Sequence, residues 1–442
     1  MGIETALKQS QNPKTTSSEL EKLLWLDDDI DLLIAMHQNA TSALLDLLID
    51  EKGWDAQIVK AVLQNANISQ ERMLELGRKY PVEILKNPSL ESRLFADHEL
   101  LRDIPEVLSI SECPEFYIRW VAKNGNLTQK IYIRLNPNTP KDIQDELSPK
   151  YFDQEAAVKI KQLSESLDNA DAQRCLEAYS QTSLPYCLPK FLPFDRDNIA
   201  HRFEDQLICG FPFTSKSWPW PKDQNGNPMQ PLVQLDLANV RKNLGLPLGD
   251  GLLQVWRNAG QLIRIIPVQS LNETLDTYYP EETPWTDKEE WTIYGLTNMH
   301  GLDVNNCRIE WIPLGKMYPS FCSKMWEWSE SNWPNPDNAS KFASHREFDA
   351  LYQIVESLSI PQRGGINCFQ TDPIFTLGGW PSTSGNDSLP IAEEIMILNI
   401  VDDFDVNFSW ILVANFDKSI KTRETVLITD TVNFEIRESC LR

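Results

Sequence analysis

The side chains that most often carry catalysis or bind metal ions are few and scattered in this chain. The histidines are His37, His98, His201, His300 and His345, and none of them forms a His-x-x-x-His or His-Glu-x-x-His metal pattern. There is no Gly-x-Ser-x-Gly turn for a nucleophilic serine, no phosphate-binding loop and no dinucleotide-binding glycine pattern. The 8 cysteines contain no Cys-x-x-Cys pair. We therefore expect no catalytic residues, no metal, no cofactor and no structural disulfide.

Carboxylates are the one reactive group that gathers in the sequence. They occur in three runs: Asp27 to Asp29 with Asp31; Glu281 and Glu282 with Asp287, Glu289 and Glu290; and Asp402 and Asp403 with Asp405. Such runs are typical of solvated faces. A hydrolase that uses a pair of carboxylates stays the alternative, because proximity in space is not visible in a sequence.

The overall charge excludes some classes of partner. The formal net charge is -23, from 41 Lys and Arg against 64 Asp and Glu. This balance argues against nucleic acid and against an anionic membrane surface, both of which select basic proteins. It favours either encounter with a basic protein or simple solubility. The first residues lack the apolar core of a signal peptide and no 18 apolar residues run together, so we expect a cytoplasmic protein.

The elements that would position any site change character along the chain. Apolar residues recur with a helical period of 3.6 up to about residue 180 and with a strand period of 2 beyond it. We predict an α+β protein with a helical repeat-like domain over residues 1–180. A mixed or antiparallel β-sheet domain with helices follows over residues 181–442.

The helical half contains a recurring unit in which an asparagine follows a helical segment and a Ser, Thr or Pro opens the next one. The expected seam residues are Asn39, Asn65, Asn87, Asn124 and Asn136, and their spacing is uneven. The run Asn136 to Pro140 resembles the hallmark of the variant leucine-rich repeat, an all-helical repeat. Some members of that family carry a cysteine cluster ahead of the repeats. This chain has none, so the resemblance implies no iron–sulfur cofactor.

The second half opens with two Trp-Pro pairs, at Trp218 and Trp220, that we expect to form an extended arm over the sheet. A turn at Asn225-Gly226 follows, and then a strand whose last residue leads into a helix from Asp236 to about Leu244. A hairpin is predicted around Asn258 to Gly260. Three strands are expected near the end, of which Ile395 to Val401 is apolar on both faces and therefore central in the sheet.

The order of these motifs resembles the YwqG-like family, a bacterial domain of unknown function, over roughly residues 200–435. The matching positions are Gly210 and Pro212; Trp218 and Pro219; Gly226 and Pro228; Gln234, Asp236 and Leu237; Gly251 to Gln254 with Trp256; and Leu377 to Pro381. Family members usually also show a Leu-Leu-Gln-Ile-Asp strand and a Trp-Gly-Asp, which this chain replaces. An activity that used those polar residues is therefore expected to be lost here.

The resemblance implies a function, because YwqG-like domains recur among immunity proteins of bacterial polymorphic-toxin secretion systems. We expect a non-enzymatic protein that binds and neutralises a basic toxin encoded by a neighbouring gene. The alternative is an enzyme or small-ligand-binding protein that uses the Trp-rich sheet domain. Acidic groups beside apolar anchors suit a basic partner. The candidate partner-binding residues are Glu281, Glu282, Glu289, Glu290, Trp326, Glu327, Trp328, Glu330 and Trp333.

Overall fold

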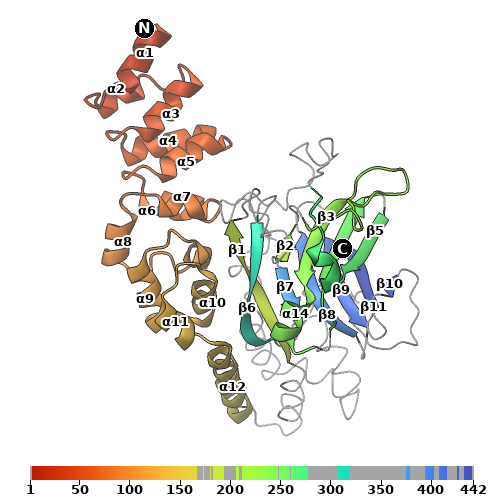
Figure 1. Ribbon diagram of the computed structural model, residues 1–442. Coiled ribbons are helices and arrows are strands. Elements are labelled where there is room, and N and C mark those ends of the chain that lie inside the picture. The colour runs from red at the N-terminus through yellow and green to blue at the C-terminus, as the bar shows by residue number, and fades with distance from the viewer. Residues whose placement is uncertain are drawn as a thin grey trace, which may run out of the picture. The chain divides into compact units, whose positions relative to one another are not determined.

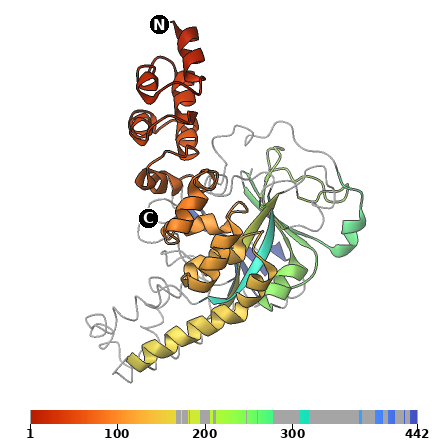
Figure 2. The ribbon, with the colours of Figure 1, turned by 90° about the vertical axis from the view of Figure 1, so that its left-hand side faces the viewer.

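The computed structural model divides the chain into two compact units, drawn in Figures 1 and 2. It describes residues 2–166, 173, 180, 183–193, 206–208, 212–246, 248–258, 260–276, 307–317, 375–378, 394–402, 408–415, 426–427 and 433–440. The first unit extends to Pro140 and is helical, and the described strands all belong to the second unit, which begins at Lys141. The chain therefore has the predicted α+β class.

Helices in the first unit follow one another in pairs (Figure 1). They are α1 (Ile3–Ser10), α2 (Ser17–Glu21), α3 (Asp28–Met36), α4 (Ser42–Lys52), α5 (Ala56–Leu63), α6 (Gln70–Gly77), α7 (Pro81–Leu85), α8 (Leu90–Ala96), the 3₁₀ helix η1 (Pro105–Ser109), α9 (Glu115–Asn124) and α10 (Leu127–Leu135). The second members of successive pairs contact one another, α3 with α5, α5 with α7, α7 with η1, and η1 with α10. Fully buried side chains such as Ile34, Ile58 and Ile84 form the core between them.

The turns that join one helix pair to the next are tied together by buried side chains. We call these the seam turns; they begin at residues 12, 37, 65, 87, 110 and 136. The first residues of these turns are joined by side-chain bonds from His37 Nε2 to Asn12 O (2.9 Å), Asn65 Nδ2 to His37 O (3.0 Å), Asn87 Nδ2 to Asn65 O (2.9 Å) and Asn136 Nδ2 to Ile110 O (2.6 Å). These bonds span 25, 28, 22 and 26 residues, so the array is regular.

These hydrogen bonds from one seam turn to the next form a ladder. Histidine at residue 37 can replace asparagine in it because one ring nitrogen accepts a hydrogen bond and the other donates one, as the oxygen and nitrogen of an asparagine amide do. Nδ1 accepts a hydrogen bond from the backbone N–H of Asn39 at 3.0 Å. The proton must therefore be on Nε2, which donates to Asn12 O. In Asn65 the same two roles fall to Oδ1, which accepts from Asn67 N, and to Nδ2.

Two of the five expected seam residues do not open a seam turn. Asn39 lies two residues after His37, and its amide donates to Pro13 O and Thr15 O in a second column of bonds. Asn124 lies in the last turn of α9 and donates to Trp120 O of the same helix. The spacing expected from the sequence was uneven because the seam positions at His37 and Ile110 are not asparagines. Ile110 contributes only its carbonyl to the ladder.

The second unit is built on an antiparallel sheet. Its strands are β1 (Leu184–Pro193), β2 (Gln206–Ile208), β3 (Gln230–Asp236), β4 (Leu252–Asn258), β5 (Gly260–Ile266), β6 (Cys307–Met317), β7 (Phe375–Gly378), β8 (Glu394–Asp402), β9 (Phe408–Asn415), β10 (Val426–Leu427) and β11 (Asn433–Cys440). Within the described residues their order in the sheet is β10-β11-β9-β8-β7-β1-β6-β2-β3-β4-β5.

Two helices that precede the strands belong to this second unit. They are α11 (Lys141–Glu146) and α12 (Pro149–Ser166), the long yellow helix of Figure 2. α12 contacts β6, where Asp153 Oδ1 accepts the backbone N–H of Lys316 at 2.8 Å. Gly315 allows this approach, because its φ is +89° and an added Cβ would meet Asp153 and the backbone of Pro149. The domain boundary that periodicity predicts near residue 180 stays a prediction.

Several local predictions for this unit are confirmed. Helix α14 (Leu237–Leu244) begins after Asp236, whose carboxylate accepts from Ala238 N, and ends at Gly245 with φ +68°. β4 and β5 form the expected hairpin, and β8 lies between β7 and β9 in the sheet. Strand β11 was not predicted. Of the third strand expected near the end, only the two residues of β10 lie within the described residues.

Candidate functional site

All nine partner-binding residues predicted from the sequence lie outside the described residues. They fall in residues 277–306 and 318–374, so their prediction stays untested. The carboxylate run of Asp27 to Asp29, which the sequence analysis interpreted as a solvated face, lies within the described part and borders two exposed tryptophans. This places a candidate surface in the helical unit.

Large apolar side chains are exposed at the turns within the first helix pairs. Trp25 and Leu26 precede α3 and are 45% and 44% exposed, and Trp54 precedes α5 and is 79% exposed. Exposed carboxylates flank them, at Asp28 and Glu51. We call these five residues the Trp25–Trp54 surface. Burying these partly exposed indoles against another molecule would be strongly favourable, which makes the surface a candidate binding site.

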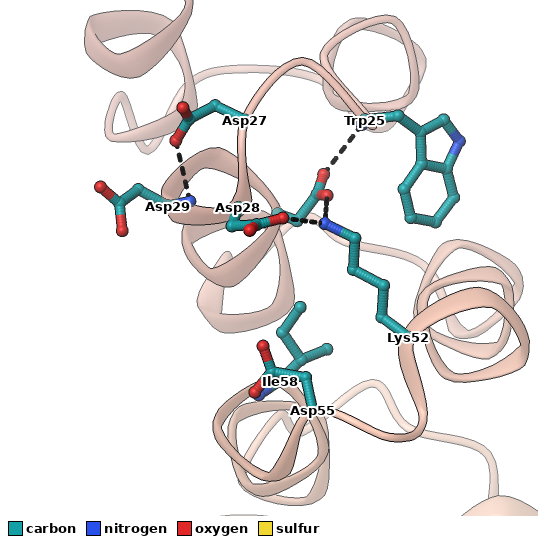
Figure 3. A network of polar contacts seen from close by, with 8 residues as sticks. Trp25, Asp27, Asp28, Asp29, Lys52, Asp55 and Ile58 are labelled. Carbon is teal, nitrogen blue, oxygen red and sulfur yellow. Dashed lines mark hydrogen bonds and ion pairs between the residues drawn. The ribbon is translucent and has the colours of Figure 1, made fainter.

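A network of polar contacts connects the two turns of the Trp25–Trp54 surface (Figure 3). Lys52 Nζ lies 2.5 Å from a carboxylate oxygen of Asp28 and 2.5 Å from one of Asp31, and 5.7 Å from the centroid of the Trp25 ring. The Asp31 side chain is fully buried. Burial alone would lower the pKa of Lys52, but its bonds to the two carboxylates outweigh burial and raise the pKa. Lys52 is therefore a fixed positive charge that pairs the buried Asp31.

The backbone of Trp25 is held in an unfavourable conformation by the same network. Its φ is +66°, a left-handed conformation that bulky side chains rarely adopt and that costs about 1–3 kcal/mol. The backbone N–H of Trp25 donates to Asp31 Oδ1 at 3.0 Å, which fixes this conformation. The result is a partly exposed indole whose backbone is fixed by Asp31.

Part of the acidic character around this surface is structural. Asp27 accepts the backbone N–H of Asp29 at the start of α3, and Asp55 accepts those of Gln57 and Ile58 at the start of α5. Asp31 is paired to Lys52. Asp28 also contacts Lys52, but its side chain is 84% exposed, so it remains open to solvent along with Glu51. These two carboxylates give the surface its accessible negative charge.

Sequence reasoning missed this surface, although a signal was present. Trp25 stands directly before the run Asp27 to Asp29, and Trp54 stands between Lys52 and Asp55. Helical periodicity places the neighbouring leucines in the core, but it does not show that these two tryptophans are in turns. An alignment of the turn before α3 with the turn before α5 would have shown that Trp25 and Trp54 both stand in turns.

A second polar cluster lies in the sheet unit, where the Trp-Pro arm of residues 212–222 covers β3, β4 and β5. Gln234 and Gln254 are fully buried on adjacent strands. Gln254 Nε2 donates to Gln234 Oε1 at 2.7 Å and to Phe213 O at 2.8 Å, and Gln234 Oε1 accepts Phe213 N at 2.8 Å. The two amides thus bind both backbone groups of Phe213 and fix the start of the arm.

The arm is held along its length by aromatic packing. Phe213 packs against Leu252 and Ile266, and Trp220 lies edge-on to Trp256 with ring centroids 5.0 Å apart. Trp220 Nε1 donates to Met229 O at 2.8 Å. The arm predicted from the two Trp-Pro pairs is therefore present as a packed cover over the sheet.

Residues 207–424, which contain this cluster, match the model of a family described as a domain of unknown function, DUF1963. We call this matching region the DUF1963 domain. The match is consistent with the YwqG-like domain expected from the motifs. Three of those motif residues have structural roles in the DUF1963 domain: Gln234 and Gln254 bind the arm, and Trp256 packs against it. No curated protein gives a significant match to this chain.

The Gln234–Gln254 cluster has a structural role in the described part of the DUF1963 domain. Amide and indole groups do not change protonation near neutral pH, so the Gln234–Gln254 pair positions backbone and transfers no protons. Within the described ranges, no three His, Cys, Asp or Glu side chains gather as a metal site. No helix of the described chain is long and apolar enough to cross a membrane.

Proposed function

We propose that this chain is a non-enzymatic protein-binding module whose partner presents a basic surface. The observation that carries the proposal is the Trp25–Trp54 surface, in which exposed indoles stand beside accessible carboxylates. Tryptophans are the commonest anchors of protein interfaces, and flanking charges select a partner of opposite sign. A helical array with few repeats still offers an extended surface of the kind that binds macromolecules.

The finer proposal is that the partner is a toxin and this chain its immunity protein. Its support is the resemblance of the DUF1963 domain to YwqG-like domains found among such proteins, together with the net charge of -23. The negative charge of an acidic protein increases the rate at which it meets a basic partner. The partner to test is the protein encoded by the neighbouring gene.

Removing the two indoles should weaken this complex. We expect the Trp25→Ala, Trp54→Ala double variant to bind the neighbouring gene's product about 30-fold more weakly, which corresponds to the roughly 2 kcal/mol of an interface anchor. The loss should appear mainly as faster dissociation, because anchors act after encounter. Surface plasmon resonance on the full-length chain measures both rates.

Two further variants make this test specific. Met36→Ala removes an apolar side chain that is 65% exposed at the other end of α3, and it should leave binding unchanged. Asp28→Asn with Glu51→Gln should slow association several-fold at low salt and leave dissociation nearly unchanged. Equal losses in the Met36 and tryptophan variants would show that the complex forms elsewhere.

A further inference from the structure

The guanidinium of Arg264, on strand β5 of the DUF1963 domain, is only partly satisfied by hydrogen bonds. Its Nε donates to Gln254 Oε1 and its Nη1 donates to Pro219 O, both at 2.8 Å. Its Nη2 is buried and has no hydrogen-bond partner within the part of the chain that the structure describes. An arginine has five N–H donors, so three of them, one on Nη1 and two on Nη2, have no acceptor among the described residues.

The positive charge of Arg264 also has no described counterion. Among the described residues no carboxylate forms an ion pair with it, whereas Arg241 on the same unit pairs with Asp250 at 2.8 Å. Burial lowers the pKa of Arg264 to about 10, so the guanidinium is still protonated at neutral pH. A buried cation without an anion is strongly unfavourable.

Aromatic rings stabilise the cation without satisfying that edge. The guanidinium carbon lies 5.1 Å from the ring centroid of Trp256 and 6.0 Å from that of Trp218. Such contacts favour a cation but take no hydrogen bond from it. The unsatisfied Nη1–Nη2 edge matches the two oxygens of a carboxylate, the planar group that guanidinium binds in pairs of parallel bonds.

The Nη1 side of this edge contacts the arm. Pro219, which accepts from Nη1, is exposed, and it lies between the half-buried Trp218 and the buried Trp220. Pro219 is therefore the exposed residue of the arm that borders this edge, whereas Phe213 at the start of the arm is fixed by the two glutamines. We propose that the DUF1963 domain binds a carboxylate group at the Nη1–Nη2 edge of Arg264, between the arm and strand β5. This site is separate from the Trp25–Trp54 surface.

Succinate is a suitable probe, tested at millimolar concentrations because the net charge of -23 slows the encounter with an anion. We expect succinate to raise the Tm of the full-length chain saturably and to change tryptophan fluorescence, relative to sodium chloride at equal ionic strength. Arg264→Met should abolish both effects. Arg264→Lys keeps the charge but loses the paired donors, so its apparent Kd should rise at least tenfold.

The control is Arg241→Met, which removes an arginine of the same unit that is already paired, and this variant should respond like the wild type. A wild-type chain without a saturable response would overturn the proposal. So would an Arg264→Met chain that folds and still responds. A response to phosphate that succinate does not reproduce would show that the edge is not a carboxylate site. If the wild-type chain gives no saturable response, Arg264 serves only to hold Pro219 in place.

Discussion

The Asn65→Ala variant is expected to lower the free energy of unfolding of the helical unit by about 3 kcal/mol. Asn65 is buried and makes three hydrogen bonds, to Ala35 O at 2.8 Å, to His37 O at 3.0 Å and from Asn67 N at 3.0 Å. Alanine cannot replace any of them, so Ala35 O and Asn67 N–H lose the partner that Asn65 gives them, and His37 O keeps only its bond from Ala40 N at 3.0 Å. Urea denaturation followed by circular dichroism should show an earlier loss of helical signal.

The matched control for this variant is Asn124→Ala. Asn124 makes one exposed bond within its own helix, to Trp120 O, so its removal should change the unfolding free energy by less than about 0.5 kcal/mol. Asn65→Asp is a second probe, because a carboxylate cannot donate to the two carbonyls and should destabilise at least as much at pH 7. Similar losses for Asn65→Ala and Asn124→Ala would contradict the ladder of seam turns.

The Gln254→Leu variant is expected to destabilise the DUF1963 domain by about 4 kcal/mol. The Gln254 amide donates to Phe213 O and Gln234 Oε1 and accepts from Arg264 Nε and, at 3.3 Å, from Trp256 Nε1. Leucine has a similar volume but removes all four of these hydrogen bonds, and Arg264 Nε and Trp256 Nε1 lose the acceptor that Gln254 gives them. The arm should then detach at its start, and tryptophan emission should shift to longer wavelength at temperatures where the wild type is folded.

Gln269→Leu provides the control for this variant, since Gln269 is exposed on the short helix η3 (Val268–Asn272). That substitution should leave the Tm within about 1 °C of the wild type, as is usual for surface positions. An unchanged Tm and unchanged emission in Gln254→Leu would mean that the two glutamines do not hold the arm.

Local rules were enough to predict part of this fold. The helix α14 follows from Asp236 as its N-cap and Gly245 as its C-terminal glycine, and both act within a few residues of the chain. The turn at Gly226, with φ +85°, follows from the Asn-Gly pair in the same way. The central place of β8 follows from apolar residues on both of its faces.

The residues that begin the seam turns could be identified only from the structure. Their role in the ladder depends on where they lie in the turn and not on which amino acid they are. His37 takes part through its ring and Ile110 through its backbone alone, so neither is visible as a repeat of asparagine. The candidate surface was missed for a related reason. The exposure of Trp25 depends on a left-handed backbone held by Asp31, six residues away, and that contact has no signature in the periodicity.

Binding to a partner with a basic surface is tested most directly by titrating the full-length chain with the protein encoded by the neighbouring gene, at low and at raised salt. We predict a saturable complex at low salt whose affinity falls steeply as salt increases, since exposed charges are screened within about 10 Å at 0.1 M. Calorimetry gives both the stoichiometry and the Kd. The absence of any complex at low salt, or a Kd that does not change with salt, would contradict the proposal of a basic partner.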